Sequence, residues 1–150
     1  MTLTYLGNRD LLHLPKTAFL ASSTIPVEMV MRSYEWAIAM RKEGRCIISG
    51  FSSKLERDVW NFLVKGKQPI ILVLARSLYL RVPPELQSLL DAGRLLIIST
   101  SASDRQSKAT AQARNRYICE LADQIVFVGA TESSSLYPLK ADYRDKLSSI

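Results

Sequence analysis

The stretch PIILVLA, residues 69–75, decides the fold because it is a continuous apolar run with no polar residue at alternate positions. A strand with one face in water alternates apolar and polar residues, whereas a strand buried on both faces does not. The run therefore predicts an interior strand of a parallel sheet. Four similar runs accompany it: AFLAS (18–22), CIISG (46–50), LLIIS (95–99) and QIVFVGA (124–130).

Helical patterns separate these runs. Val27, Val30, Met31 and Tyr34 recur at three- and four-residue spacing, typical of one helix face, and Gly44 is expected to end that helix. Further helices are predicted at residues 55–63 and 84–92. Strands that alternate with helices predict a three-layer α/β, Rossmann-like fold with a mainly parallel sheet of five strands or slightly more. We expect a single domain over residues 1–150, with a leading segment at 1–17 and a tail or short helix at 139–150.

The amino-acid composition indicates which classes of molecule the protein could bind. The chain has 150 residues, 47% of them hydrophobic, which is enough apolar mass for one globular core. Lys and Arg number 20 against 14 Asp and Glu, so the net charge of +6 favours nucleic acid, nucleotides or acidic protein surfaces as partners. No apolar stretch approaches the roughly 18 residues that span a bilayer, and no leader pattern opens the chain. We therefore expect a cytoplasmic protein with no membrane partner.

The sequence offers little for metal or catalytic chemistry. Cys46 and Cys119 lie in apolar patterns typical of buried, reduced thiols, and His13 is the single histidine. A metal site is therefore not expected, nor is any cofactor. No glycine-rich nucleotide motif and no recognisable nucleophile–base pair is present, so we expect a binding protein rather than an enzyme.

Small hydroxyl residues follow every predicted strand, at the edge where ligands bind in such folds. Hydroxyls and backbone N–H groups donate to phosphate, although serine is also ordinary loop and helix-capping chemistry. Basic residues fall at the same edge, among them Arg105 and Lys108. These features predict a phosphate or nucleic-acid site that includes Ser22, Ser23, Ser49, Gly50, Lys54, Arg76, Arg114 and Ser133.

The stretch ATAQARNRYICELADQIVFVGATESSS, residues 109–135, places Arg114 and Arg116 in what the pattern indicates is the first turn of a helix. The helix dipole disfavours cations there, and a residue that violates a local rule is a candidate for function. Arg114 shares a face with Ile118 and would extend it toward the ligand edge; the alternative is that it only covers apolar surface. Arg116 is expected to pair with Glu120.

The segment RNRYICELADQIVFVGA, residues 114–130, resembles the DNA-processing protein A family (DprA or Smf), in which Arg-Asn-Arg opens a helix that leads into an apolar strand. Collinear matches cover residues 5–136: YLGNRDLL, EGRCIISGFSSKLE, PIILVLARSL and LLDAGRLLIIST. The resemblance implies a nucleic-acid site at Arg114, Asn115 and Arg116. It also implies single-stranded DNA as ligand, a role in recombination mediation beside a RecA-type recombinase, and a homodimer as a possible assembly.

The chain departs from the family pattern in ways that change its charge. Ser22, Ser23 and Thr24 stand where the family has Gly-Ser-Arg, and Arg76 stands within the replacement of a Gly-Cys-Gly. One alternative function is a sensor domain that binds a nucleotide or nucleotide derivative, and another is a purely structural partner domain. Single-stranded DNA requires a basic track leading away from the pocket, whereas a sensor requires only a closed pocket. Phe51 and Tyr79 are candidates for base stacking or, alternatively, packing residues.

Overall fold

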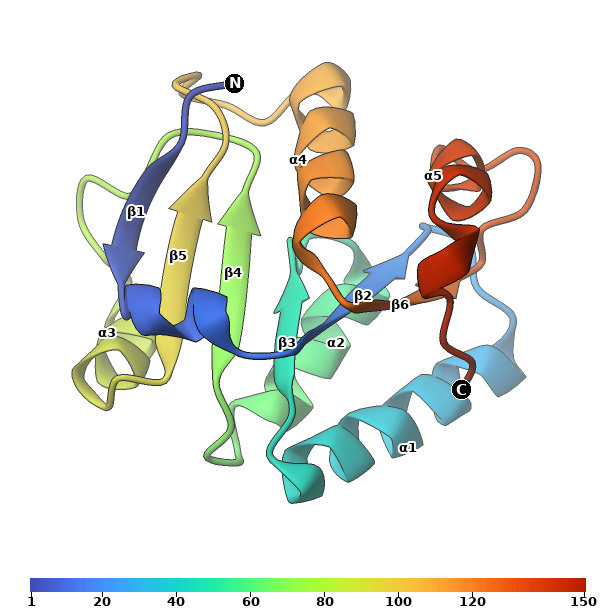
Figure 1. The fold of residues 1–150 in the computed structure, drawn as a ribbon, viewed down its shortest axis with the longest axis horizontal. Coiled ribbons are helices and arrows are strands. Elements are labelled where there is room, and N and C mark those ends of the chain that lie inside the picture. The colour runs from blue at the N-terminus through green and yellow to red at the C-terminus, as the bar shows by residue number, and fades with distance from the viewer.

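The computed structural model describes residues 1–150 and consists of a six-stranded sheet between two layers of helices (Figure 1). The strand order is β1-β5-β4-β3-β2-β6. The strands are β1 (Thr4–Gly7), β2 (Lys16–Ala21), β3 (Cys46–Ser49), β4 (Ile70–Leu74), β5 (Leu95–Ser99) and β6 (Gln124–Val128). The helices are α1 (Val27–Glu43), α2 (Lys54–Leu63), α3 (Pro84–Asp91), α4 (Lys108–Leu121), α5 (Tyr137–Asp142) and two short 3-10 helices, η1 (Arg9–His13) and η2 (Arg144–Lys146).

The central strand confirms the prediction made from residues 69–75. β4 lies between β3 and β5 and is parallel to both, with Ile71 opposite Ile48 on one side and Leu96 on the other. All five of its residues are buried because helices cover both faces of the sheet. The five predicted runs all form strands, and β2 to β6 pair in parallel.

The sixth strand, β1, lies in the leading segment and pairs antiparallel with β5, with Tyr5 opposite Ile98. It has only four residues, half-exposed at the sheet edge, so it carries no long apolar run in the sequence. Gly7 ends the strand at a positive φ of 109°, where a Cβ would lie 2.4 Å from the carbonyl oxygen of Leu95. Only glycine fits this turn.

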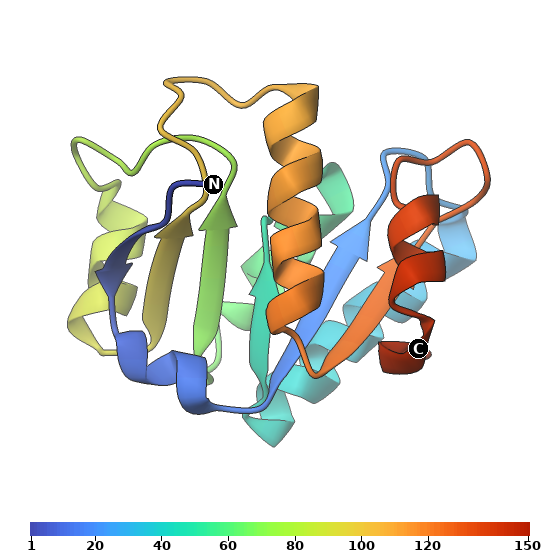
Figure 2. The ribbon, with the colours of Figure 1, turned by 45° about the horizontal axis from the view of Figure 1, so that its top comes forward.

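The helices divide between the two faces, as Figure 2 shows from a second angle. α1, α2 and α3 cover one face, where Ala37, Leu63 and Leu89 join the core. α4 and α5 cover the other face through Ile118 and Leu139. Gly44 ends α1 in the left-handed conformation, as predicted. The short helix expected near the C-terminus is α5, which begins at Tyr137. None of the helices has the length and apolar character needed to cross a membrane.

The predicted start of α4 is wrong. The helix begins at Lys108, after the N-cap residue Ser107, whose hydroxyl accepts from the N–H of Thr110 while the Thr110 hydroxyl accepts from the N–H of Ser107. This reciprocal cap uses Thr where the sequence signature has Glu or Gln, so it gave no clear signal. Arg114 and Arg116 therefore lie well inside the helix, where the dipole no longer opposes a cation.

Both cysteines are buried and unpaired, as predicted. Burial raises the pKa of each thiol, Cys46 and Cys119, to about 12, so almost no reactive thiolate exists near neutral pH. We expect neither thiol to react with a disulfide reagent in the native protein and both to react after unfolding without reductant. Time-resolved thiol labelling measures this, and an unfolded, unreduced sample without free thiols would contradict it.

Candidate nucleic-acid interface

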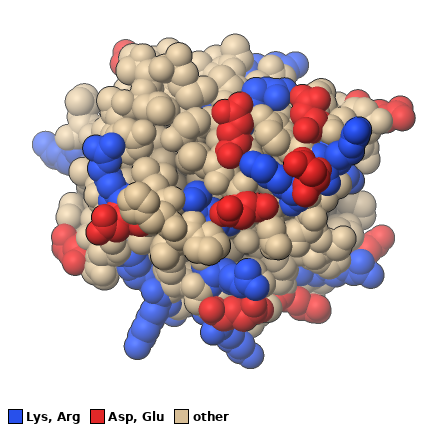
Figure 3. Space-filling model, viewed as in Figure 1, with Lys and Arg blue, Asp and Glu red and all other residues tan.

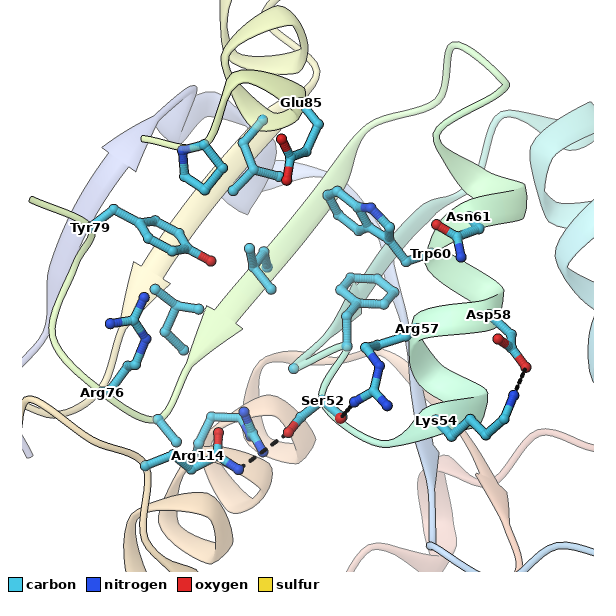
Figure 4. A pocket seen from close by; sticks show the side chains of 18 residues that line it. Ser52, Lys54, Arg57, Asp58, Trp60, Asn61, Arg76, Tyr79, Glu85 and Arg114 are labelled. Carbon is cyan, nitrogen blue, oxygen red and sulfur yellow. Dashed lines mark hydrogen bonds and ion pairs between the residues drawn. The ribbon is translucent and has the colours of Figure 1, made fainter. Parts of the chain in front are cut away.

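Two hollows open at the edge of the sheet where the parallel strands end. The first, called here the cleft, has a volume of about 650 Å³ and lies between α2 and the loop that follows β4 (Figure 4). The second, called here the serine hollow, has a volume of about 820 Å³ and lies between the loops that follow β2 and β6. β2 has β3 on one side and β6 on the other, so the serine hollow occupies the switch point of the sheet.

Arg114 enters the cleft from the opposite face of the sheet. It belongs to α4, but its side chain passes over the end of the short strand β3, and its Nη1 donates to the carbonyl oxygen of Val73 in β4 at 3.3 Å. Gly50 makes this crossing possible, because a Cβ at that position would lie 2.4 Å from Nη1 of Arg114. Gly50 and Arg114, both predicted as site residues, are therefore in contact, and Gly50 leaves the space that the Arg114 guanidinium occupies.

The Arg114 guanidinium is a buried cation without a salt bridge. Only 3% of the residue is exposed, and its Nε donates to Oδ1 of Asn115 at 2.8 Å. Burial lowers the pKa of Arg114, and the nearby Glu56 carboxylate partly opposes that shift. Arginine stays protonated in proteins, so an anion that enters this end of the cleft would meet a fixed positive charge.

Glu56 forms no salt bridge with Arg114, and its oxygens bind backbone groups. The residue is 4% exposed; its Oε2 accepts from the N–H of Ala21 at 3.0 Å, and its Oε1 accepts from the N–H of Ser52 at 2.9 Å and of Ser53 at 3.3 Å. One carboxylate thus ties the end of β2 to the first turn of α2. Glu56 is therefore part of the scaffold that holds the site.

Further cations stand at the mouth of the cleft. Lys54 opens α2, and its side chain is 82% exposed with only a 3.5 Å contact to Asp58. Arg57 follows one turn later and donates to the carbonyl oxygen of Ser52. Arg76 lies on the opposite wall, 4.8 Å from the centre of the Tyr79 ring. Sequence reasoning missed Arg57, because a basic residue among alternating charges is typical of a solvated helix face.

Apolar and aromatic side chains also line the cleft, beside the polar Asn61 and Gln106 and the carboxylates of Asp58 and Glu85. Phe51 is buried and packs edge-on against Trp60, with ring centres 5.0 Å apart, so it is a packing residue. Tyr79 lines the cleft opposite Trp60, and its hydroxyl points inward in Figure 4. The cleft therefore joins a cationic end to an aromatic wall, a combination suited to a phosphate with an attached base. Trp60 gave no sequence signal, because a tryptophan on a helix is ordinarily core.

The serine hollow collects the other predicted hydroxyls. Ser22, Ser23 and Ser133 line it together with Asn115 and Lys108. The Ser22 hydroxyl is already engaged, since it donates to the carbonyl oxygen of Gly129 at 2.9 Å. Arg114 faces the cleft and its neighbour Asn115 faces the serine hollow, so this pair lies between the two.

Two predicted residues lie in neither hollow. Ser49 is fully buried, and its hydroxyl accepts from the N–H of Phe51 at 3.0 Å. Arg116 is exposed and pairs with Asp142 at 3.0 Å, so the predicted pair with Glu120 is wrong. The reason is tertiary: α5 packs beside α4 and brings Asp142 within reach, while Glu120 accepts from the Tyr143 hydroxyl at 3.3 Å.

Fold and site together define a Rossmann-like α/β domain that presents a cationic cleft at the carboxyl edge of its sheet. The chain belongs to the DNA recombination-mediator protein A family, whose model matches residues 1–139. This confirms the family resemblance expected from the sequence. No curated protein sequence matches the chain significantly.

Solved structures share the fold at low sequence identity. DNA processing protein A from Helicobacter pylori, solved for its single-stranded DNA binding mode, superposes with a TM-score of 0.76 at 22% identity, covering 98% of this chain and 70% of that one. The Streptococcus pneumoniae protein gives a TM-score of 0.77 at 21% identity, covering 98% of this chain and only 54% of that one. A molybdenum cofactor binding protein from Rippkaea orientalis is more distant, with a TM-score of 0.58 at 14% identity, 91% of this chain and 77% of that one.

Proposed function

We propose that this chain binds single-stranded DNA at the cleft and acts in DNA processing as a recombination mediator. The observation that carries the proposal is the buried, unpaired guanidinium of Arg114 at the end of the cleft. A phosphate there would receive a charge-assisted hydrogen bond in a poorly hydrated position, the strong form of such contacts. Family membership and the single-stranded DNA binding of the Helicobacter pylori relative support the same ligand.

Some cleft residues would contact the phosphate backbone of the DNA, and others would contact its bases. Arg114, Arg57 and Lys54 would contact phosphates, whereas Tyr79, held beneath Arg76, would stack on a base. The serine hollow would hold the neighbouring phosphates through Ser22, Ser23, Asn115, Ser133 and Lys108. Gly50 and Ser49 contribute by shaping the end of β3. Arg116, which pairs with Asp142 outside both hollows, is not among the proposed contacts.

The proposal extends to partners on family resemblance alone. A RecA-type recombinase would be loaded on the bound strand, with a homodimer as the working form. The chain would act by binding, without a catalytic step. The alternative, a nucleotide-binding sensor, has no observation in its favour beyond the cleft itself.

Salt dependence tests the proposal. Each neutralised phosphate of single-stranded DNA contributes about −0.7 to the slope of log K against log salt, so four contacts predict a slope of about −3. Fluorescence anisotropy with a labelled oligodeoxythymidylate at several salt concentrations measures it, beside a panel of mononucleotides. If the DNA fails to bind while a nucleotide raises the melting temperature, the sensor function replaces this proposal.

A further inference from the structure

One helix carries a row of exposed polar residues with no acid among them. On α2 and just beyond its end, Lys54, Arg57, Asn61 and Lys65 are exposed at spacings of three, four and four residues, which places them along one side of the helix. Arg57 and Asn61 also line the cleft, so the row starts inside it. At a rise of about 1.5 Å per residue, it extends about 12 Å from Arg57 to Lys65.

The row ends in the loop between α2 and β4, where two lysine side chains form no polar contact with the rest of the protein. The carbonyl groups of this loop already have partners: Arg94 donates to Leu63, Val64 and Gln68, and Arg41 donates to Phe62. These two arginines neutralise the carboxyl end of α2. Lys65 and Lys67 are both exposed and form no hydrogen bond or salt bridge; the Lys65 ammonium is 6.0 Å from the centre of the Phe62 ring.

Other basic residues gather at this end of the molecule. Lys42 and Arg45 are exposed at the end of α1, next to the loop that Arg41 holds, although Arg45 pairs with Glu43 at 3.3 Å. Basic side chains project furthest from the lower edge of Figure 3, where α1 ends and the α2–β4 loop turns, with acidic side chains beside them. The opposite wall of the cleft leads to α3, whose exposed charged residues, Glu85 and Asp91, are acidic. The cations on that wall are Arg76 and Arg81, in the loop before α3, whereas the α2 side carries Lys54, Arg57, Lys65 and Lys67, so the balance of charge favours the α2 side.

We propose that single-stranded DNA leaves the cleft along the outer side of α2 and ends its contact on Lys65 and Lys67 in the α2–β4 loop. The inference rests on the proposed function and adds a second backbone contact region to it. This region reads no bases, because lysine ammonium groups on an open surface contact phosphates as point charges. It supplies the basic track leading away from the pocket that distinguishes a polynucleotide ligand from a nucleotide.

Oligonucleotides of two lengths distinguish binding at the track from binding at the cleft. A fluorescein-labelled oligodeoxythymidylate of about 6 nucleotides fills the cleft, whereas one of about 20 nucleotides also reaches the loop. Lys65→Glu/Lys67→Glu is expected to weaken binding of the long oligonucleotide roughly tenfold and flatten its salt slope by about 1.4, at about 0.7 per contact. Binding of the short oligonucleotide is expected to stay within about twofold of the parent.

The control makes the same charge change elsewhere. Lys140→Glu/Arg144→Glu alters two exposed cations at α5 and η2, and its binding of both oligonucleotides is expected to match the parent. Lys65→Gln/Lys67→Gln provides a milder variant, and circular dichroism checks the fold of each. The proposed track would be wrong if the Lys65→Glu/Lys67→Glu variant lost equal affinity for both oligonucleotides, or if the control variant lost as much affinity. Either result would still allow binding of DNA at the cleft. If the parent binds neither oligonucleotide, the proposed function fails and the track fails with it.

Discussion

Arg114→Met is expected to weaken single-stranded DNA binding roughly 30- to 100-fold, because a buried charge-assisted contact contributes about 2–3 kcal/mol. The guanidinium is 3% exposed and has no carboxylate partner, so it would meet a phosphate with little competition from water. The salt slope should flatten by about 0.7. Anisotropy titrations at several salt concentrations measure both quantities.

The same substitution should leave the protein folded. Arg114 is buried, but an unpaired buried charge is itself costly. Methionine fills similar space, and the Val73 carbonyl loses one donor, so the free energy of unfolding should change by no more than about 2 kcal/mol. Arg116→Met is the matched control, since Arg116 lies on the same helix but pairs with Asp142. Equal binding by the two variants would remove Arg114 from the site.

Glu56→Gln is expected to lower the free energy of unfolding by about 3 kcal/mol. The carboxylate accepts from three backbone N–H groups on two segments, and an amide in its place turns one acceptor into a donor that faces another donor. Either the end of β2 or the start of α2 would lose its acceptor, according to which way the amide turns. Since α2 forms one wall of the cleft, DNA binding should weaken as well.

Chemical denaturation with the DNA-free protein measures this loss. Glu35→Gln is the control, because Glu35 is exposed on α1 and has no hydrogen bond, so its free energy of unfolding should stay within about 0.5 kcal/mol of the parent. If Glu56→Gln were as stable as this control, the capping network would contribute nothing to the fold.

The sequence alone determined the architecture of the parallel sheet, because a strand that is buried on both faces consists of consecutive apolar residues. A parallel strand between two helical layers needs apolar residues at every position, and β4 shows this in five consecutive residues. The same reasoning placed Arg114, Arg76, Lys54 and Gly50 at one edge, where the structure brings them together around the cleft. A short edge strand such as β1 carries no such mark, because half of it faces water.

Tertiary structure alone decided which of the predicted residues share a space. Ser49 is fully buried because it is the last residue of β3 and pairs within the sheet, whereas Ser22 follows β2 and lines the serine hollow. Arg114 reaches the cleft from the opposite face only because β3 ends early and Gly50 lacks a side chain. Arg116 pairs with Asp142 rather than Glu120 because α5 packs beside it. Periodicity reports which face of an element is buried, whereas contacts between elements depend on packing distances that no single segment encodes.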